Sequence, residues 1–308
     1  MNSQTAVETD EERTRAGVIS AVLAYLLWGI LPVYFKLVNE IPAFEVLVHR
    51  IVWAVPFGLA IILVRKQLSE VKRAFKDRRT FGFLSLAAVL IAANWWVYVV
   101  AVQREQIFQA SLGYYINPLL YVLVGVTFFG ERLRRFQITA VVLAAIGVAV
   151  LTFSGGQFPA IALALALLFT VYGVIRKQII VGGMPGLFIE TLVLFPPAIM
   201  YLMWLTRAGQ SSFTPADPGL LGILILAGPV TVLPLLFFAL AARRLRLSTI
   251  GFLQFMAPTL QFLIGIYYGE ELTTPHLICF CLIWIAVSLF IFDAWRLRRE
   301  REALSVAT

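Results

Sequence analysis

Ten long apolar stretches run along the chain, each about as long as a membrane-spanning helix. A helix needs about 20 mostly apolar residues to cross the hydrocarbon core of a bilayer. The stretches that meet this length are 17–38, 43–64, 80–101, 108–130, 136–154, 159–176, 186–206, 219–242, 249–269 and 275–293. Barrel strands would instead alternate apolar and polar residues, and lipid excludes open sheet edges. The pattern therefore predicts an all-α polytopic membrane protein with ten transmembrane helices.

The composition agrees with a chain embedded in lipid. Of the 308 residues, 60% are hydrophobic and 14% are charged, and the mean hydropathy is +0.88. Soluble domains are about 45–50% apolar and about 25% charged, so an ordinary soluble enzyme is excluded. A net charge of +8 would suggest a nucleic acid partner for a soluble protein. Here we expect the lipid bilayer and a small-molecule substrate as partners, and no nucleic acid.

The distribution of Lys and Arg predicts which way the chain faces. Basic residues gather in the tails and in every second loop, while the alternate loops hold only Arg104 and Arg207. Cytoplasmic segments of membrane proteins are enriched in Lys and Arg. We therefore expect a cell (inner) membrane protein whose N-terminal tail, residues 1–16, and C-terminal tail, residues 294–308, are both cytoplasmic. The first tail is polar and has no evident cleavage site after it, so no cleaved signal peptide is expected.

The two halves of the chain resemble each other. Residues 113–133 align with residues 251–272, and both copies end in Gly-Glu-x-Leu. The matched positions are Pro118 with Pro258, Gly125 with Gly265 and, further upstream, Glu45 with Glu190. We therefore predict two five-helix repeats, residues 17–154 and residues 157–293.

An odd number of helices in each repeat has a consequence for orientation. Five spans bring the chain out on the opposite side, so the second repeat must enter the membrane inverted. Inverted repeats allow two exchangeable conformations, one open to each side, as alternating access requires. The alternative is a duplicated fold that was kept for stability alone, since repeats also occur in channels and membrane enzymes.

Three ionisable residues lie close together in the second predicted span. Glu45 and His49 are four residues apart and share a helix face, and Arg50 lies one step further round. Ionisable groups at lipid depth are costly unless they face a partner or a cavity. We expect the three residues to bind substrate or to act in gating, and His49 could also couple proton movement to transport. A purely structural network is the alternative.

Two charge pairs flank turns on opposite sides of the predicted membrane. Lys36 and Glu45 flank the outer turn between the first two spans, and Lys177 and Glu190 flank the inner turn between the sixth and seventh. We predict that each pair forms part of a gate, one at each mouth. Simple snorkelling of the lysines to the interface is the alternative.

A second polar cluster is predicted from the third, fourth and ninth spans. Tyr114, Asn117 and Tyr121 follow the spacing of one helix face. Such a stripe can hold an amphipathic or zwitterionic metabolite through hydrogen bonds and ring contacts. The residues expected to line the cavity are Asn94, Tyr98, Tyr114, Asn117, Tyr121, Gln254 and Gln261, with Trp95 and Trp96 beside them. Interfacial aromatic belts and helix-to-helix amide bonds are the alternatives.

Several short blocks in the first half form a recognisable combination. They are Trp28-Gly29-x2-Pro32-x-Tyr34-x-Lys36, Glu45-x3-His49-Arg50-x2-Trp53, Asn94-Trp95-x2-Tyr98, Ser111-Leu112-Gly113-Tyr114-Tyr115-Ile116-Asn117-Pro118 and Gly130-Glu131-Arg132-Leu133. Together they resemble the RarD group of EamA-type drug/metabolite transporters, over residues 17–293. The second half has Ala257-Pro258 where the first has Asn117-Pro118, so a ligand role of Asn117 would not be mirrored.

The resemblance implies a fold and a function. It implies a ten-helix inner-membrane carrier with two EamA repeats and a central substrate cavity. Characterised relatives export amino acids or other small metabolites, and the RarD group is linked by name to chloramphenicol sensitivity. The physiological substrate does not follow from the resemblance.

The motifs that are missing from the chain narrow the function. There is no G-x4-G-K-[ST] motif for nucleotide hydrolysis, and two His and two Cys leave little material for metal or nucleophile chemistry. We expect no enzyme, no cofactor and no metal, but a secondary transporter that works by alternating access. Its cargo would be a small amphipathic metabolite or drug-like molecule, amino-acid-like or amphenicol-like, moved by efflux. A polytopic membrane enzyme and a passive channel are the alternatives, and both a monomer and a homodimer stay open.

Overall fold

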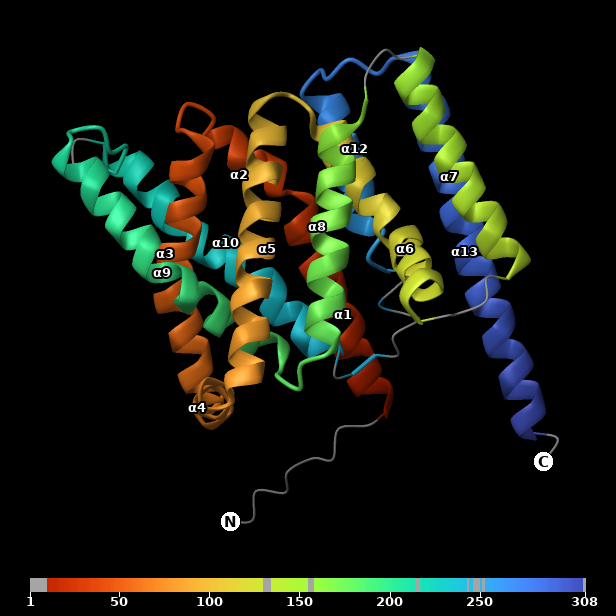
Figure 1. Ribbon diagram of the computed structural model, residues 1–308, viewed down its shortest axis with the longest axis horizontal. Helices are drawn as coiled ribbons and strands as arrows, with labels where there is room; N and C mark the ends of the chain where they lie inside the picture. Colours follow the sequence, from red (N-terminus) through yellow and green to blue (C-terminus); the bar gives the residue numbers. More distant parts are fainter. Residues whose placement is uncertain are drawn as a thin grey trace.

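The computed structural model describes residues 10–129, 134–154, 158–213, 217–242, 244–245, 250 and 253–306, and every regular element in these ranges is a helix (Figure 1). In chain order the helices are α1 (Asp10–Gly29), α2 (Leu31–Leu37), α3 (Ala43–Val64), α4 (Leu68–Lys76), α5 (Arg78–Gln103), α6 (Ile107–Phe129), α7 (Arg135–Ser154), α8 (Ala160–Lys177), α9 (Gly183–Arg207), α10 (Pro218–Ala242), α12 (Met256–Tyr267) and α13 (Thr274–Val306). The all-α architecture is therefore confirmed for the described residues.

Eight of the described segments are long and apolar enough to cross a membrane. α1 and α2 together form the first, Glu11–Leu37, and the others are α3, α5, α7, α8, α9, α10 and the first part of α13, Thr274–Asp293. The predicted spans 108–130 and 249–269 correspond to α6 and to the 12-residue α12, and parts of both spans lie outside the described residues. The helices make the chain a multi-pass membrane protein, while the number ten stays a prediction.

The helix of the first span is interrupted just before a proline. Pro32 stands in the first turn of α2, and a proline has no N–H to donate to the preceding turn. The helix therefore breaks at Ile30, where Val33 N donates to Ile30 O at 3.0 Å. After the break α2 packs against α5 and α12, and Tyr34 and Phe35 are buried.

Helix contacts recur between the two halves of the chain. α1 packs on α10 and α12, while α8 packs on α5 and α6. α3 packs on α10 as α9 packs on α5, and three pairs join the halves directly: α3 with α9, α6 with α12, and α7 with α13. In these contacts each helix of the first half has a counterpart in the second half. The corresponding helices are α1 and α8, α3 and α9, α5 and α10, α6 and α12, and α7 and α13. In Figure 1, α7 and α13 lie side by side at one edge of the bundle, away from α3 and α9.

α3 and α9 run in opposite directions along each other. At the start of α3, the Phe44 ring lies 4.9 Å, centroid to centroid, from the ring of Tyr201 in the second half of α9. Further along α3, Gly58 faces Phe188, which is near the start of α9. Glu45 and Glu190 stand near the starts of the two helices, and they therefore lie at opposite ends of this pair.

Candidate functional site

A buried arginine is the most unusual side chain of the described helices. Arg50 of α3 is 3% exposed, and its Nε donates to Thr231 Oγ1 of α10 at 3.1 Å. The guanidinium carbon lies 4.5 Å from the ring centroid of Trp95 and 5.2 Å from that of Phe35. A cation within about 6 Å of an aromatic ring is attracted to its face. Within the described ranges, no carboxylate lies at ion-pair distance from Arg50.

Tyrosines complete the surroundings of this arginine. Tyr34, Tyr98 and Tyr114 are close enough to interact electrostatically with the Arg50 guanidinium. The rings of Tyr98 and Tyr114 are 5.8 Å apart. Tyr98 is 2% exposed, and its hydroxyl has no hydrogen-bond partner among the residues that the structure describes. A cation and an unsatisfied hydroxyl therefore share one buried aromatic environment.

Asn94 fixes the position of one of these tyrosines. Its Nδ2 donates to the backbone oxygen of Leu165 in α8 at 3.1 Å, and its Oδ1 accepts from the Tyr114 hydroxyl at 3.3 Å. α5, α6 and α8 are thus joined at one buried amide. The structure brings together four residues that the sequence singled out: Arg50, Asn94, Tyr98 and Tyr114.

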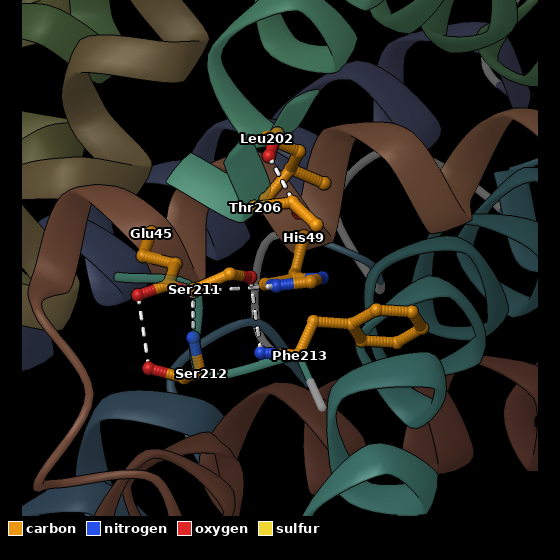
Figure 2. Close-up of polar contacts among 7 residues, drawn as sticks. All are labelled: Glu45, His49, Leu202, Thr206, Ser211, Ser212 and Phe213. Atoms are coloured by element: carbon orange, nitrogen blue, oxygen red, sulfur yellow. Dashed lines mark hydrogen bonds and ion pairs between the residues drawn. The ribbon is translucent and has the colours of Figure 1, made fainter. Parts of the chain in front are cut away.

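Glu45 and His49 belong to a different contact, shown in Figure 2. The Glu45 carboxylate accepts from the Ser212 backbone N at 2.7 Å and from the Ser212 hydroxyl at 3.0 Å. His49 Nε2 lies 3.9 Å from Glu45 Oε1, and its ring packs 5.3 Å from that of Phe213. Neither ring nitrogen of His49 has a hydrogen-bond partner in the described part of the chain. Glu45 and His49 therefore hold residues 211–213, which follow α9, against the start of α3.

The expected three-residue network is therefore divided in two. Glu45 and His49 share a face of α3, whereas Arg50 is rotated by about 100° from His49. That rotation turns the guanidinium toward Thr231 and Trp95 instead of toward the Glu45 carboxylate. The three residues therefore do not form a single contact network, and their expected roles in binding or gating stay a prediction.

The remaining predicted cavity residues are dispersed. Asn117 is buried, and its Oδ1 has no partner among the described residues. Gln261 Nε2 donates to the Trp28 backbone oxygen at 3.1 Å, which links α12 to α1. Gln254 is half-buried in the turn before α12, so it does not continue a stripe along that helix. The side chain of Tyr121 lies outside the described residues, and Trp96 is exposed on the surface of α5.

Both predicted charge pairs have different partners in the structure. Lys36 Nζ lies 3.3 Å from Glu105 Oε1 and not beside Glu45, whose carboxylate is occupied by Ser212. At the other end, Arg176 Nε lies 3.5 Å from Glu190 Oε1, while the neighbouring Lys177 is exposed. Adjacent residues point about 100° apart on a helix, so only one of these two cations can face Glu190. Glu190 is fully buried and also accepts from the Tyr172 hydroxyl at 3.2 Å.

Several partners of the candidate residues were not predicted from the sequence. Thr231 offered a signal, because it is a hydroxyl in a span that is otherwise apolar. Ser212 and Glu105 lie in connections between helices, where a polar residue is ordinary. Glu270 belongs to the repeated Gly-Glu-x-Leu motif, and its carboxylate accepts from the Phe108 backbone N at 3.1 Å.

Glu270 predicts a pH dependence of stability. Burial raises the pKa of Glu270 to about 7, and the negative charge of Glu105 also raises it. The backbone N–H groups at the start of α6 and the positive charge of Lys36 lower this pKa, but by less. Between about pH 4.5 and about pH 7 the folded chain holds a proton on Glu270 that the unfolded chain has lost. The group's contribution to stability therefore falls as pH rises through this window. We expect Glu270→Gln to flatten the dependence of the thermal midpoint of the purified protein on pH.

Glu40 provides the control for this measurement. It is an exposed carboxylate in the connection between α2 and α3, so Glu40→Gln should keep the wild-type profile. Equal slopes for wild type and Glu270→Gln between about pH 4.5 and about pH 7 would contradict the assignment.

The described residues contain no cluster suited to a metal. No group of three or more His, Cys, Asp and Glu side chains comes together within the described ranges. Cys279 is buried and Cys281 is exposed, and both are free thiols. The polar chemistry that the site offers is the binding of a charged or hydrogen-bonding molecule.

Comparisons with known proteins agree with this architecture. Residues 15–153 match the EamA-like transporter family. "Protein RarD" of Salmonella typhi is 43% identical over 293 residues, which cover 95% of this chain and 100% of that protein. An "Uncharacterized transporter" of Vibrio cholerae is 42% identical and covers 92% of this chain and 94% of its own. One solved crystal structure has a similar fold, with a TM-score of 0.59 at 19% identity, over 89% of this chain and 96% of that one.

Proposed function

The chain belongs to the RarD group of the EamA-like transporter family, within the drug/metabolite transporters, and we propose that it exports a small amphipathic metabolite or drug-like molecule by alternating access. In this proposal two inverted five-helix repeats supply ten spans, and both termini face the cytoplasm. Efflux across the inner membrane would be secondary transport, since the chain has no P-loop motif.

The exchange of helix contacts between the halves carries this proposal. A bundle in which the main helix contacts of one half recur in the other can have two related arrangements of comparable energy. If the halves are inverted, each arrangement opens to a different side of the membrane. The buried Arg50 group, with contributions from α3, α5, α6 and α10, would then be reached from each side in turn.

The two buried glutamates are the proposed gate residues. Glu45 holds Ser212 at one end of the α3–α9 pair, and Glu190 holds Arg176 and Tyr172 at the other end. Each contact joins segments that have to separate for that end to open. The ion pair between Lys36 and Glu105 lies at the surface of the protein, since the side chain of Glu105 is 76% exposed.

Counterflow in proteoliposomes tests the function. Vesicles containing the purified full chain are loaded with an unlabelled candidate and diluted into a trace of the same compound carrying a radiolabel. A carrier accumulates the label transiently and saturates with concentration, because each inward movement is exchanged for an outward one. We expect this behaviour for at least one compound among neutral and aromatic amino acids, aromatic carboxylates and chloramphenicol.

The alternatives give different results in the same vesicles. A channel would let the label equilibrate without saturation and without transient accumulation. A membrane enzyme would change the compound chemically, which chromatography of the vesicle contents detects. Either result, found for every compound that crosses, contradicts alternating access.

A further inference from the structure

We infer that Arg50 binds a carboxylate, so that the transported molecule is a small organic monoanion with an apolar body. The inference rests on the proposed transport function and adds the chemical class of the cargo. It starts from the buried guanidinium, its incomplete set of partners and the rings around it.

Among the described residues, Arg50 finds acceptors for only part of the hydrogen bonds that a guanidinium can make. The group has five N–H donors and stays charged, and in the described residues only the Thr231 hydroxyl accepts from it. A buried cation without a counter-ion is strongly destabilising. The contacts with Trp95 and Phe35 and one neutral hydrogen bond offset only part of that cost. The donors on the two terminal nitrogens are therefore available to an anion.

The acidic residues of the described helices do not supply that anion. Glu45 is the closest in the sequence, but it lies on another face of α3 and is bound by Ser212. Glu190 lies at the opposite end of the α3–α9 pair and is bound by Arg176. Among the described residues the positive charge at Arg50 therefore has no counter-ion, and we assign it to a molecule that binds there.

The geometry and charge of the site favour a carboxylate among anions. A planar guanidinium fork matches the two oxygens of a carboxylate. Arg50 is a single positive charge, and a phosphate dianion would require a second cation beside it. The Tyr98 hydroxyl, which has no partner among the described residues, is a further donor in the same environment. The rings of Trp95, Phe35 and Tyr114 offer apolar contact to the rest of the molecule.

Four compounds of similar size test the inference on the purified full chain. They are 3-phenylpropionate, its neutral amide 3-phenylpropanamide, the cation phenethylamine, and phenyl phosphate. A ligand that binds only the folded state raises the thermal midpoint with concentration, which gives an apparent Kd. We expect 3-phenylpropionate to stabilise the protein and the other three to have no effect.

Variants locate the binding on Arg50. Arg50→Met should weaken the binding of 3-phenylpropionate by about 30-fold or more, because the carboxylate loses its buried positive partner. Arg104→Met is the control, since Arg104 is an exposed arginine just after α5, and it should bind like wild type. Tyr98→Phe removes only an unpartnered hydroxyl, so it should fold normally and bind several-fold more weakly. It keeps the test decisive if Arg50→Met fails to fold.

Several results would overturn the inference. They are stabilisation by the amide, the amine or the phosphate equal to that by 3-phenylpropionate, an unchanged response in both Arg50→Met and Tyr98→Phe, or no response to 3-phenylpropionate at all. A carrier of neutral or cationic cargo would fail this test and still show counterflow. Failure of the inference and failure of the transport function are therefore separate results.

Discussion

Gly228→Ala is expected to lower the thermal midpoint of the purified protein by about 5 °C or more. Gly228 of α10 faces α3, where a Cβ atom would overlap the Trp53 carbonyl oxygen and would lie 2.6 Å from Phe57 Cδ2. Small residues permit such close approach between helices in a membrane. The oxygen is a backbone atom and cannot move aside without shifting α3. The helices must therefore separate, and with them Arg50 and Thr231.

Gly222→Ala is the matched control in the same helix. No atom lies within 4 Å of a Cβ built there, so this change should leave the midpoint unchanged or raise it slightly. Adding Phe57→Ala should not rescue Gly228→Ala, because the backbone overlap remains. Equal midpoints for the two glycine variants would show that α3 and α10 do not pack as described.

Much of the fold could be predicted from the sequence because lipid allows few solutions. Long apolar stretches must be helices where no water can satisfy the backbone. Each predicted stretch corresponds to a described helix, although α1 begins earlier, at Asp10, and α13 continues beyond its predicted end to Val306. The break at Ile30 was not predicted, because residues 17–38 read as one continuous apolar run. Its cause, Pro32, was visible, but a proline also occurs within unbroken spans such as α3 at Pro56.

The choice of partners could not be predicted in the same way. Helical spacing places Glu45 and His49 on one face, but the residue opposite that face, Ser212, is 167 positions away from Glu45. Likewise, spacing alone does not decide whether Arg176 or Lys177 meets Glu190. Such contacts depend on how whole helices are rotated and shifted against one another. The candidate residues were therefore easier to find than the pairs that they form.

In the proposed gate, Glu45→Ala is expected to open the end of the bundle where Glu45 binds Ser212. The change removes both acceptors of the Ser212 bonds, at 2.7 and 3.0 Å, and leaves a half-buried N–H without this partner. Hydrogen bonds to a charged group contribute about 1.5–3 kcal/mol each. Losing them should also free Phe213, whose ring packs against His49 and Trp53. The open state should therefore become more populated by about 10-fold or more.

A reporter thiol measures this opening without knowledge of the cargo. Ala227→Cys, in a chain whose two native cysteines are replaced by alanine, puts the thiol in the same apolar cluster as Phe213, where Ala227 is 0% exposed. We expect a membrane-impermeant maleimide, applied from each side in turn, to modify it about 10-fold faster in Glu45→Ala, from one side only. Glu40→Ala removes an exposed carboxylate near the same end and should have no effect.

A double variant decides whether Glu45 acts through Ser212. Ser212→Ala removes one of the two hydrogen bonds and keeps the backbone N–H, so its labelling rate should lie between those of the parent and Glu45→Ala. With Glu45 already absent, the hydroxyl has lost its acceptor, so the double variant should label no faster than Glu45→Ala alone. Additive rates would mean that the two residues act separately. An unchanged rate in Glu45→Ala would mean that this contact does not hold the end closed.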